Sequence, residues 1–301
     1  MNKLVIITCM YISMAMVSPA NGDTLLRPGN KIISQEQVIH SREVYKTVDT
    51  IKLTADIFYT MRSFEKEDNT AIVFFHGGGW AYGSPEEFFS TCERYARKGI
   101  IAISVSYRLS IENGVTPHKT ISPIESAMDA RSAIRWVRAN AARFHIDKNK
   151  IVAAGQSAGG HLALSTAMID LYNEKSDDLT VSCRPDALLL FSACVNAVEG
   201  WCDRLLAGRR DKIWSISPAH NIKGGMPPMI EFHGTYDEQV PVWTVQFFQM
   251  EMKKAGNYFE LHQYEGRRHY LGEGNKLYSR YYDDEILNIA DEFLRKFNLM
   301  K

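Results

Sequence analysis

The sequence has 301 residues, of which 45% are hydrophobic and 23% are charged, an ordinary composition for a globular protein with a sizeable core in one large or two small domains. Lysine plus arginine and aspartate plus glutamate both number 35, so the formal net charge is zero. This balance argues against a nucleic-acid partner or an anionic membrane surface, and it favours small or neutral ligands.

The N-terminal residues have the pattern of a secretory signal peptide. Lys3 precedes a mostly apolar stretch over residues 4–17, and small residues follow near the expected cleavage position at Ala20. The stretch is shorter than the roughly 18 to 20 residues that span a bilayer, which disfavours a transmembrane anchor. A buried N-terminal helix is the other alternative. We therefore expect a signal peptide at 1–20, one folded domain at 21–301, a secreted or periplasmic location, and no stable membrane insertion after cleavage.

The cysteines leave two possibilities open. After loss of the signal peptide the chain keeps Cys92, Cys183, Cys194 and Cys202. In an oxidising compartment one or two disulfides can form, with Cys194 and Cys202 the nearest pair in sequence, and free buried thiols are the alternative. The spacing has no zinc-site pattern, so no metal is expected.

The first strands are predicted by alternation and by apolar runs. Residues 43–60 alternate apolar and polar side chains, which predicts two antiparallel strands at a sheet edge. Residues 71–75 and 100–107 are too apolar for a half-exposed sheet, and they predict parallel strands buried between helices. From Ile124 the period becomes helical, with an apolar face at Ala127, Ala130, Ile134, Val137, Ala141 and Phe144.

Strand and helix then alternate to the end of the chain. Strands are predicted at 150–155, 186–194, 227–234 and 258–265, and helices at 157–172, 242–256 and 282–298. Repeated strand-helix-strand units predict a three-layer α/β sandwich with a mostly parallel, roughly eight-stranded sheet. The stretch 198–225 lacks a clear period, and it is interpreted either as a small cap or as a surface excursion with one short helix.

The pentapeptide Gly-Gln-Ser-Ala-Gly at 155–159 is weak evidence by itself, because Gly-x-Ser-x-Gly arises by chance in about one chain in ten of this length. Its context is more informative. Ser157 lies where a predicted strand ends and a helix begins, a sharp turn that lifts the serine oxygen above the sheet edge. In this position Ser157 is a candidate nucleophile, and the main-chain N–H of Ala158 is a candidate oxyanion donor.

A second glycine-rich turn supplies further candidate donors. His76-Gly77-Gly78-Gly79-Trp80 directly follows the strand at 71–75, and glycines there let the main-chain N–H groups of Gly78 and Gly79 face a reacting oxygen. A phosphate-binding loop is the competing interpretation. Neither Gly-x-Gly-x-x-Gly nor Gly-Lys-Ser/Thr occurs at this position, which disfavours it.

A nucleophilic serine needs a base, and the base needs a carboxylate that orients it. Asp237 follows the strand at 227–234, and His269 follows the strand at 258–265. Ligands of such sheets gather at the carboxyl ends of strands, so Ser157, Asp237 and His269 form a candidate triad, with Glu238 as the fallback acid. The other eight histidines have plainer structural interpretations, at His40, His76, His118, His145, His161, His220, His233 and His262.

The motifs HGGGW, YRL, GQSAGGHLA and HGTYDEQVP together resemble the α/β-hydrolase esterase/lipase superfamily, particularly bacterial esterases of the hormone-sensitive-lipase-like and feruloyl/acetyl-xylan-esterase-like groups. The resemblance covers nearly all of residues 21–301 and implies an α/β-hydrolase catalytic domain. It implies that Ser157 is the nucleophile with Asp237 and His269 as its partners, and that Gly78, Gly79 and Ala158 form the oxyanion hole.

Two departures weaken the hormone-sensitive-lipase-like assignment. That group typically has Asp before the nucleophile and Pro-Glu soon after Tyr-Arg-Leu, whereas this chain has Gln156 and Ser110-Ile111-Glu112. The departures favour the secreted carbohydrate-ester branch, whose members resemble this chain in lacking a large helical lid.

The expected function is a serine carboxylic-ester hydrolase that works through an acyl-enzyme without metal or cofactor, on short-chain acyl esters including acetyl or feruloyl esters of carbohydrate. A small-molecule or carbohydrate ester is the expected partner. The alternatives are a prolyl-oligopeptidase-like serine peptidase, for whose usual β-propeller 301 residues leave no room, and a non-catalytic binding domain on a hydrolase scaffold. Such binding domains normally lack a triad member.

Two further hypotheses concern the substrate. Trp80 and Trp201 would offer flat apolar faces to a sugar or feruloyl ring if they flank the mouth of the site, although ordinary packing is an equal alternative. Arg267 and Arg268, beside His269, would recognise a substrate carboxylate, with solvated surface charge as the alternative.

Overall fold

The computed structural model of the chain describes residues 24–25, 33–34, 36–198, 202–271 and 283–301. It divides into two units, Met1–Gln35 and Glu36–Lys301. In the first unit, β1 (Thr24–Leu25) pairs antiparallel with β2 (Ile33–Ser34). The expected signal peptide lies outside the described residues.

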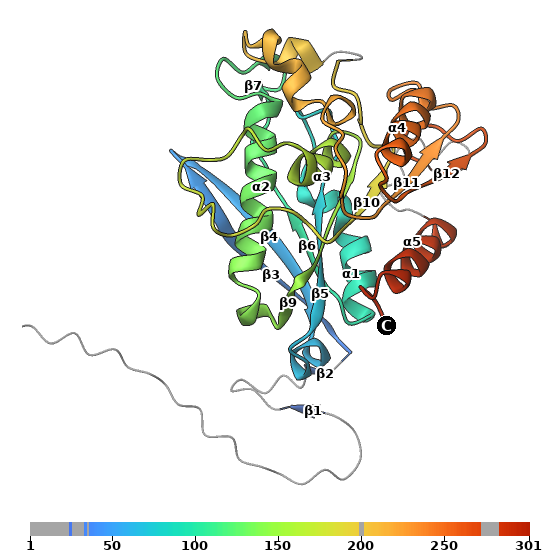
Figure 1. The fold of residues 1–301 in the computed structure, drawn as a ribbon. Coiled ribbons are helices and arrows are strands. Elements are labelled where there is room, and N and C mark those ends of the chain that lie inside the picture. Colours follow the sequence, from blue (N-terminus) through green and yellow to red (C-terminus); the bar gives the residue numbers. More distant parts are fainter. Residues whose placement is uncertain (1–23, 26–32, 35, 199–201, 272–282) are drawn as a thin grey trace, which may run out of the picture. The chain divides into compact units, whose positions relative to one another are not determined.

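The second unit is built on one eight-stranded sheet in the order β12-β11-β10-β9-β5-β6-β4-β3 (Figure 1). Its strands are β3 (Val38–Val48), β4 (Ile51–Thr60), β5 (Asn69–Phe75), β6 (Ile101–Val105), β9 (Ile146–Gln156), β10 (Ala187–Phe191), β11 (Met229–Gly234) and β12 (Phe259–Tyr264). From β12 to β6 every pairing is parallel, and β4 and β3 add antiparallel strands at the edge. The mostly parallel sheet predicted from the sequence is confirmed.

A short ribbon and several helices complete the second unit. The ribbon pairs β7 (Ile111–Glu112) with β8 (Thr116–Pro117). The α-helices are α1 (Phe89–Arg97), α2 (Pro123–Ala139), α3 (Ala158–Met168), α4 (Val242–Lys254) and α5 (Asp284–Lys296). The 3-10 helices before residue 198 are η1 (Met61–Glu65), η2 (Pro85–Phe88) and η3 (Ala142–Phe144).

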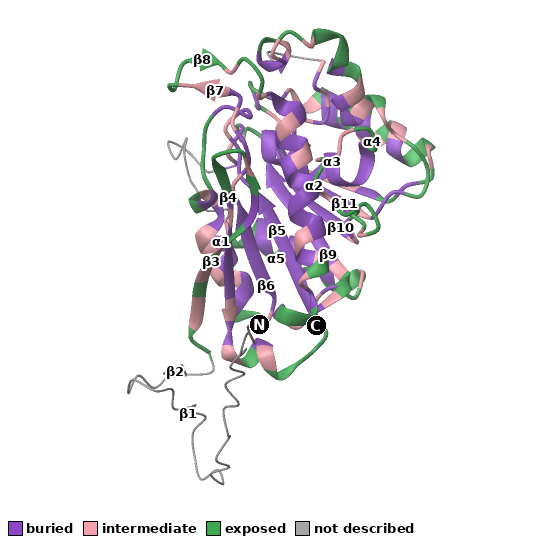
Figure 2. Ribbon diagram, turned by 90° about the vertical axis from the view of Figure 1, so that its left-hand side faces the viewer, coloured by how far each residue is buried: buried purple, intermediate pink, exposed green. Residues whose placement is uncertain are grey.

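The helices cover both faces of the sheet, because the apolar side chains of its strands point alternately to the two sides. On one face, side chains such as Val73 and Leu190 pack with residues of α2, α3 and α4. On the other face, side chains such as Phe74 and Leu189 pack with residues of α1 and α5. Figure 2 shows the buried strands between these layers. The three-layer sandwich expected from the sequence is therefore correct.

Two predicted helix ends are wrong. Helix α3 ends at Met168 and does not reach Tyr172, since Ile169 is extended and its carbonyl, with that of Ser165, accepts hydrogen bonds from Arg131 of α2. Helix α2 ends at Ala139, before the last two residues of its predicted apolar face, which lie at and within the turn of η3 and are still buried.

The segment without a clear period contains three short helices in its described part, not one. They are η4 (Cys202–Leu205), η5 (Arg210–Ile216) and η6 (Pro218–His220). Leu206 and Ile216 are fully buried and join the core on the α2 and α3 face. The Arg209 guanidinium donates to the Glu125 carboxylate at the start of α2 at 2.7 Å, which fastens this segment to that helix.

The structure shows the state of the cysteines and whether any described helix is suited to a membrane. Cys92, Cys183, Cys194 and Cys202 are all free, and three of them are buried, so the structure shows the free-thiol alternative. Among the described helices, none combines the length and the apolar character that crossing a membrane requires.

Candidate active site

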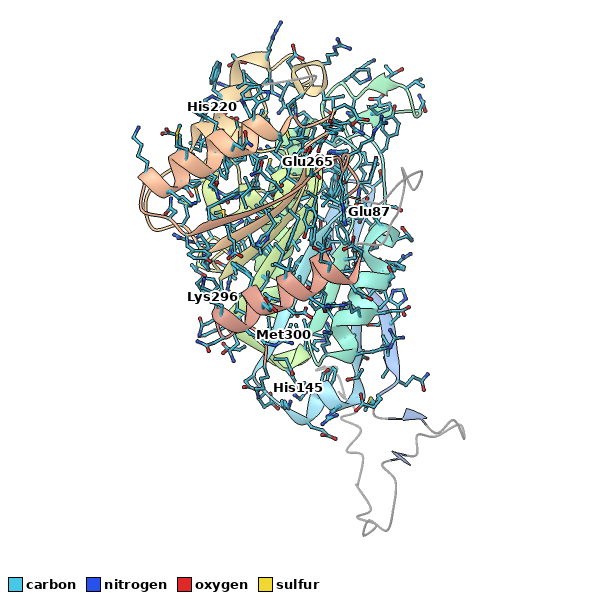
Figure 3. All side chains as sticks on the ribbon, turned by 90° about the vertical axis from the view of Figure 1, so that its right-hand side faces the viewer. Glu87, His145, His220, Glu265, Lys296 and Met300 are labelled. Atoms are coloured by element: carbon cyan, nitrogen blue, oxygen red, sulfur yellow. The ribbon has the colours of Figure 1, made fainter. Side chains whose placement is uncertain are left out.

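The candidate site lies at the carboxyl edge of the parallel strands, where β9, β11 and β12 end within one half of the sheet. Glu265, just after β12, lies toward this edge, and His145, just before β9, lies at the opposite one (Figure 3). The three candidate triad residues all follow strands that end at this edge.

Ser157 occupies a strained turn between β9 and α3. Its backbone has φ 56° and ψ −118°, a conformation that L-residues rarely adopt and that is often found at functional sites. Its N–H donates to the Phe191 carbonyl at the end of β10, and its carbonyl accepts from the Cys194 N–H at 3.1 Å. From Ile151 to Ile169 every residue except Ser157 is buried. The turn thus leaves the serine accessible within a closely packed surrounding.

The glycines of the pentapeptide are required because neighbouring backbone approaches them closely. A Cβ on Gly155 would lie 2.3 Å from the Gly159 carbonyl oxygen, and a Cβ on Gly159 would lie 2.0 Å from the Phe75 carbonyl oxygen and 2.5 Å from that of His76. The second contact places the first turn of α3 directly against the chain that enters the HGGGW loop. The two motifs that were separate in sequence therefore meet.

The HGGGW loop itself runs through left-handed backbone, with φ of 103° at Gly78, 59° at Gly79 and 60° at Trp80. The Tyr107 hydroxyl supports the loop by donating a hydrogen bond to the His76 carbonyl at 2.9 Å. Among the described residues, the main-chain N–H groups of Gly78 and Gly79 have no hydrogen-bond acceptor. They are available to a ligand.

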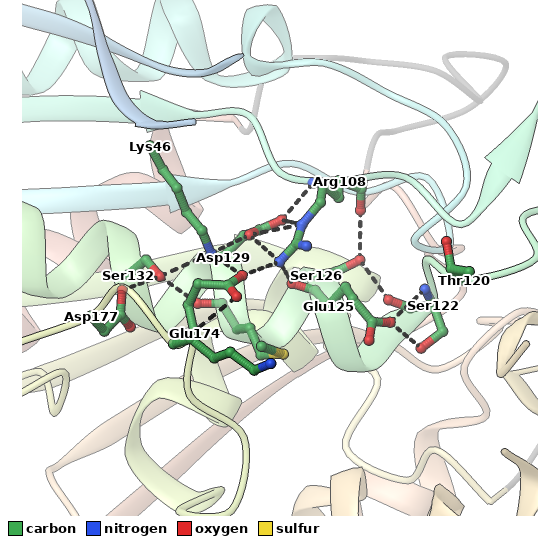
Figure 4. Close-up of polar contacts among 12 residues, drawn as sticks. Lys46, Arg108, Thr120, Ser122, Glu125, Ser126, Asp129, Ser132, Glu174 and Asp177 are labelled. Carbon is green, nitrogen blue, oxygen red and sulfur yellow. Dashed lines mark hydrogen bonds and ion pairs between the residues drawn. The ribbon is translucent and has the colours of Figure 1, made fainter. Parts of the chain in front are cut away.

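The YRL motif supports this loop through a buried polar cluster. The Asp129 carboxylate of α2, fully buried, accepts from the Arg108 N–H at 2.9 Å, from its guanidinium at 2.7 Å and from Lys46 Nζ at 2.7 Å (Figure 4). Glu174 completes the charge balance with ion pairs to both cations. The cluster holds the backbone of Arg108, the residue next to Tyr107, whose hydroxyl contacts the HGGGW loop.

Trp80 does not face a substrate, so that hypothesis is wrong for this residue. Its side chain is 3% exposed and its indole N–H donates to His161 Nδ1 at 3.2 Å. His161 Nε2 in turn donates to the Ile216 carbonyl, so the ring is the neutral Nε2–H tautomer. Burial lowers the pKa of His161 to about 4. This neutral ring ties the HGGGW loop and α3 to the segment after η4; Trp201 lies outside the described residues.

Asp237 and His269 are in direct contact. His269 Nδ1 donates to Asp237 Oδ2 at 2.7 Å, and Asp237 Oδ1 accepts from the N–H groups of Gln239 and Val240. Burial alone would raise the pKa of Asp237, but hydrogen bonds from His233 and His269 and the charge of His269 lower it well below its usual value. An ionised Asp237 leaves Nε2 as the basic nitrogen of neutral His269.

The loops that carry these two residues are joined along their backbones. A Cβ on Gly234 would lie 2.2 Å from the Arg267 carbonyl oxygen, and that oxygen accepts from the Tyr236 N–H at 3.0 Å. The Thr235 N–H donates to the Tyr264 carbonyl. This contact explains why the HG pair precedes Asp237 in the motif.

The remaining candidates near His269 have other partners. Glu238 is exposed and pairs with Arg268 at 3.4 Å, so Asp237 and not Glu238 contacts the histidine. The Arg267 guanidinium pairs with Asp283 at 2.5 Å and lies over the Tyr264 ring. Both contacts favour a structural role for Arg267 over carboxylate recognition.

Among the described residues, no group of three or more potential metal ligands is present.

Comparison with known proteins identifies the family. The family model described as BD-FAE matches residues 56–252. The chain belongs to the BD-FAE family. It also shares the α/β-hydrolase fold of solved esterases: the apo form of esterase 2 from Thermogutta terrifontis is 38% identical, covers 87% of this chain and 96% of its own, and superimposes with a TM-score of 0.77.

Two curated relatives of this BD-FAE protein are also esterases. Esterase LipC of Mycobacterium tuberculosis is 25% identical over 242 residues, 72% of this chain. An arylesterase of Saccharolobus solfataricus is 30% identical over 146 residues, 46% of this chain. The chain spans about half the length of LipC, 56%, and 42% of the arylesterase. The predicted resemblance to α/β-hydrolase esterases and lipases is confirmed.

One pair of buried ionisable residues in this BD-FAE protein was not predicted from the sequence. His233 and Glu231 lie on β11, are completely buried, and contact each other at 2.9 Å from Nδ1 to Oε1. His233 Nε2 lies 3.3 Å from Asp237 Oδ2. The available signal was the pattern MIEFHG, in which two ionisable residues two positions apart share one face of an otherwise apolar strand.

Proposed function

We propose that the protein is a serine carboxylic-ester hydrolase with Ser157 as nucleophile, His269 as general base and Asp237 as the carboxylate that orients it. The observation that carries the proposal is the 2.7 Å hydrogen bond between Asp237 and His269, at the sheet edge where Ser157 is held accessible in a strained turn. The esterase relatives and the BD-FAE match support the same reaction class.

The reaction proceeds through an acyl-enzyme. His269 Nε2 takes the proton from Ser157 Oγ as the oxygen attacks the ester carbonyl, and the tetrahedral intermediate then collapses with proton transfer from His269 to the leaving alcohol. In the second half, His269 removes a proton from water, hydroxide adds to the acyl carbon, and the acid leaves as Ser157 recovers its proton. Ionised Asp237 stabilises the imidazolium in both halves.

The oxyanion of both intermediates binds main-chain N–H groups. We assign this role to Gly78, Gly79 and Ala158, because the first turn of α3 packs directly against the chain that enters the HGGGW loop and the loop N–H groups are unpaired within the described residues. One such donor contributes about 2.7–4 kcal/mol of transition-state stabilisation in other acyl-transfer enzymes.

The preferred substrates are short-chain acyl esters, including acetyl or feruloyl esters of carbohydrate. Solved structures of the Thermogutta esterase 2 include propionate-bound and butyrate-bound forms, at 39% and 38% identity. The endo-1,4-beta-xylanase B of Butyrivibrio fibrisolvens is 28% identical over 174 residues, which cover 27% of that protein. The first likeness supports a short acyl group and the second a carbohydrate alcohol.

The proposed location is secreted or periplasmic. It rests on the apolar stretch over residues 4–17 and the small residues after it. Sequencing of the N-terminus of the protein recovered from outside the cytoplasm tests it, with cleavage after Ala20 or close to it as the expected result.

A substrate panel tests the function. The wild type and Ser157→Ala are assayed with p-nitrophenyl acetate, butyrate and decanoate, with acetylated xylo-oligosaccharides, and with methyl ferulate. We expect the wild type to prefer acetyl or butyryl over decanoyl esters and to release acetate or ferulate from the natural esters. Each buried methylene contributes up to about 0.8 kcal/mol where a pocket exists, so a lipid-type enzyme would gain steadily with chain length. A decanoyl preference without release from either natural ester would show that the carbohydrate-ester proposal is wrong.

A further inference from the structure

Strand β11 carries an ionisable pair where the rest of its interior face is apolar. The strand has Ile230 and Phe232 on one face, in the core with α1 and α5. Glu231 and His233 point to the opposite face, and both are fully buried. Burying two ionisable side chains is costly unless they form specific contacts, so their presence requires an explanation from their partners.

Both ring nitrogens of His233 face acceptors. Nδ1 lies 2.9 Å from Glu231 Oε1, and Nε2 lies 2.8 Å from the Val240 carbonyl oxygen and 3.3 Å from Asp237 Oδ2. A neutral imidazole has one N–H group, whereas here each of the two ring nitrogens faces an acceptor. Two N–H donors are therefore needed, which favours the imidazolium. Burial lowers the pKa of His233, but the contacts with Asp237 and Glu231 raise it to about 10.

The same pair reaches toward the nucleophile turn. Glu231 Oε1 accepts from the Ala193 N–H at 2.9 Å, and the next residue, Cys194, donates its N–H to the Ser157 carbonyl at 3.1 Å. The connection therefore runs from the acid through two buried side chains to the backbone that carries the serine. It passes through the residues just after β10, the strand that lies between β9 and β11 in the sheet.

We propose that the Glu231–His233 pair positions Asp237. The pair holds a buried cation against the Asp237 carboxylate and so fixes the position of that carboxylate relative to the Ser157 turn. His233 and His269 both contact Asp237 Oδ2, at 3.3 Å and 2.7 Å. The inference rests on the proposed roles of Asp237 and His269. His233 acts through the carboxylate and does not touch substrate in this assignment.

The shared oxygen gives the pair an electrostatic consequence. Among the described residues, the ionisable groups in contact with His233 are Glu231 on its own strand and Asp237 on the following loop. Asp237 also contacts His269, and it adds to the raised pKa of the Cys194 thiol, which burial chiefly raises. The His233 cation partly neutralises Asp237, so His269 experiences less than a full negative charge. Loss of that cation stabilises protonated His269 and reduces the neutral base available at a given pH.

The chain offers a matched control for the buried pair. Glu260 and His262 on the neighbouring strand β12 have the same residue types at the same spacing, with Oε1 to Nε2 at 2.7 Å. Their side chains are about one third exposed, and among the contacts of the described residues none joins them to Asp237. The variants Glu260→Gln and His262→Gln therefore remove the same chemistry from a place where it has no positioning role.

The experiment measures kcat and KM for p-nitrophenyl butyrate from about pH 5 to pH 9. His233→Gln should lower kcat about ten- to hundredfold with KM changed less than about threefold, and should move the acid limb of kcat/KM to higher pH by about half a unit or more. His262→Gln and Glu260→Gln should reproduce the wild-type profile. A His233→Gln profile that is only scaled down, with no movement of the acid limb, overturns the proposal.

A second variant keeps the test decisive if His233→Gln does not fold. Glu231→Gln is isosteric and keeps the oxygen that accepts from the Ala193 N–H, but it removes the counter-charge of His233. It should lower kcat several-fold, and its effect should disappear in an Asp237→Asn background, because both changes act through the same carboxylate. Additive effects overturn the inference. An active Ser157→Ala would instead refute the proposed function itself, so the two failures are distinguishable.

Discussion

The two halves of the proposed active site are held in place by different kinds of contact. Around Ser157 the contacts are backbone on backbone: glycines without Cβ atoms let Gly155, Gly159 and the Phe75 carbonyl approach closely. Around Asp237 and His269 the orientation comes from buried polar side chains with charge. The nucleophile half should therefore be sensitive to added atoms, and the acid–base half to added or removed charge.

The difference also bears on how each half tolerates solvent conditions. Main-chain hydrogen bonds such as that from the Ser157 N–H to the Phe191 carbonyl contain no titratable group. The acid–base half depends on the ionisation of Asp237, whose pKa is lowered by its histidine partners although burial opposes this. Three predictions test this contrast in order of decreasing effect on activity, and a fourth concerns the stability of the fold.

The largest effect is expected at the nucleophile. Ser157→Ala should reduce kcat for p-nitrophenyl butyrate by about 10⁴- to 10⁶-fold, because nucleophile, base and acid act as one unit. Ser165→Ala on the same helix is the control, since its hydroxyl donates to the His161 carbonyl, and it should retain wild-type activity. Activity of Ser157→Ala above a tenth of wild type would contradict the assignment.

Removing the charge of the acid should come next. Asp237→Asn should lower kcat by about 10³- to 10⁴-fold, because the amide no longer stabilises the imidazolium and permits the wrong tautomer of His269. Glu238→Gln is the matched control, as Glu238 is exposed and pairs only with Arg268 among the described residues. A crippled Glu238→Gln beside an active Asp237→Asn would show that the acid is misassigned.

Added atoms should damage the nucleophile half. Gly159→Ala should lower the free energy of unfolding by about 1–3 kcal/mol and reduce kcat, because its Cβ would lie 2.0 Å from the Phe75 carbonyl oxygen. Gly99→Ala is the comparison: its φ is 81° but nothing lies within 4 Å, so only backbone strain of about 1 kcal/mol is expected and kcat should not change. Urea denaturation and kinetics of both variants check this; equal losses of kcat would refute the close-approach argument.

The last prediction concerns stability at acid pH. Because the folded-state pKa of His161 is about 4 and its ordinary value 6.5, the unfolded chain takes up the proton first as pH falls. The free energy of unfolding should therefore decrease between about pH 6.5 and 4, by about 3 kcal/mol from this residue. His76, also buried with a pKa lowered to about 4, acts in the same direction.

Variants separate this contribution from the rest. His161→Gln should flatten the decrease in unfolding free energy below pH 6.5, whereas Ser165→Ala, which removes no titratable group from the same helix, should leave it unchanged. Urea denaturation at several pH values measures the slope. The same slope in His161→Gln and wild type would show that His161 does not carry it.

Much of the fold and the proposed triad could be predicted from the sequence because their signals are local. A buried parallel strand is a continuous apolar run, and Gly-x-Ser-x-Gly between a strand and a helix reflects the space that one turn needs. Asp237 and His269 were found in the same way, from their places after successive strands, and the structure joins them at 2.7 Å.

What the sequence left open depends on contacts between distant segments. The end of α3 at Met168 is set by Arg131 of another helix, and Trp80 is buried because His161 and Ile216 meet it from elsewhere in the chain. Free cysteines and the partner of Arg267 likewise required the packed structure.

The Glu231–His233 pair shows the limit most clearly. The sequence by itself determined that two ionisable residues share one face of a buried strand, since side chains two apart in a strand point the same way. Only the tertiary structure decided what they do, because Asp237 and Val240 on the loop after β11 and Ala193 on the loop after β10 contact them. The charge of a buried histidine is set by such neighbours and not by its own strand.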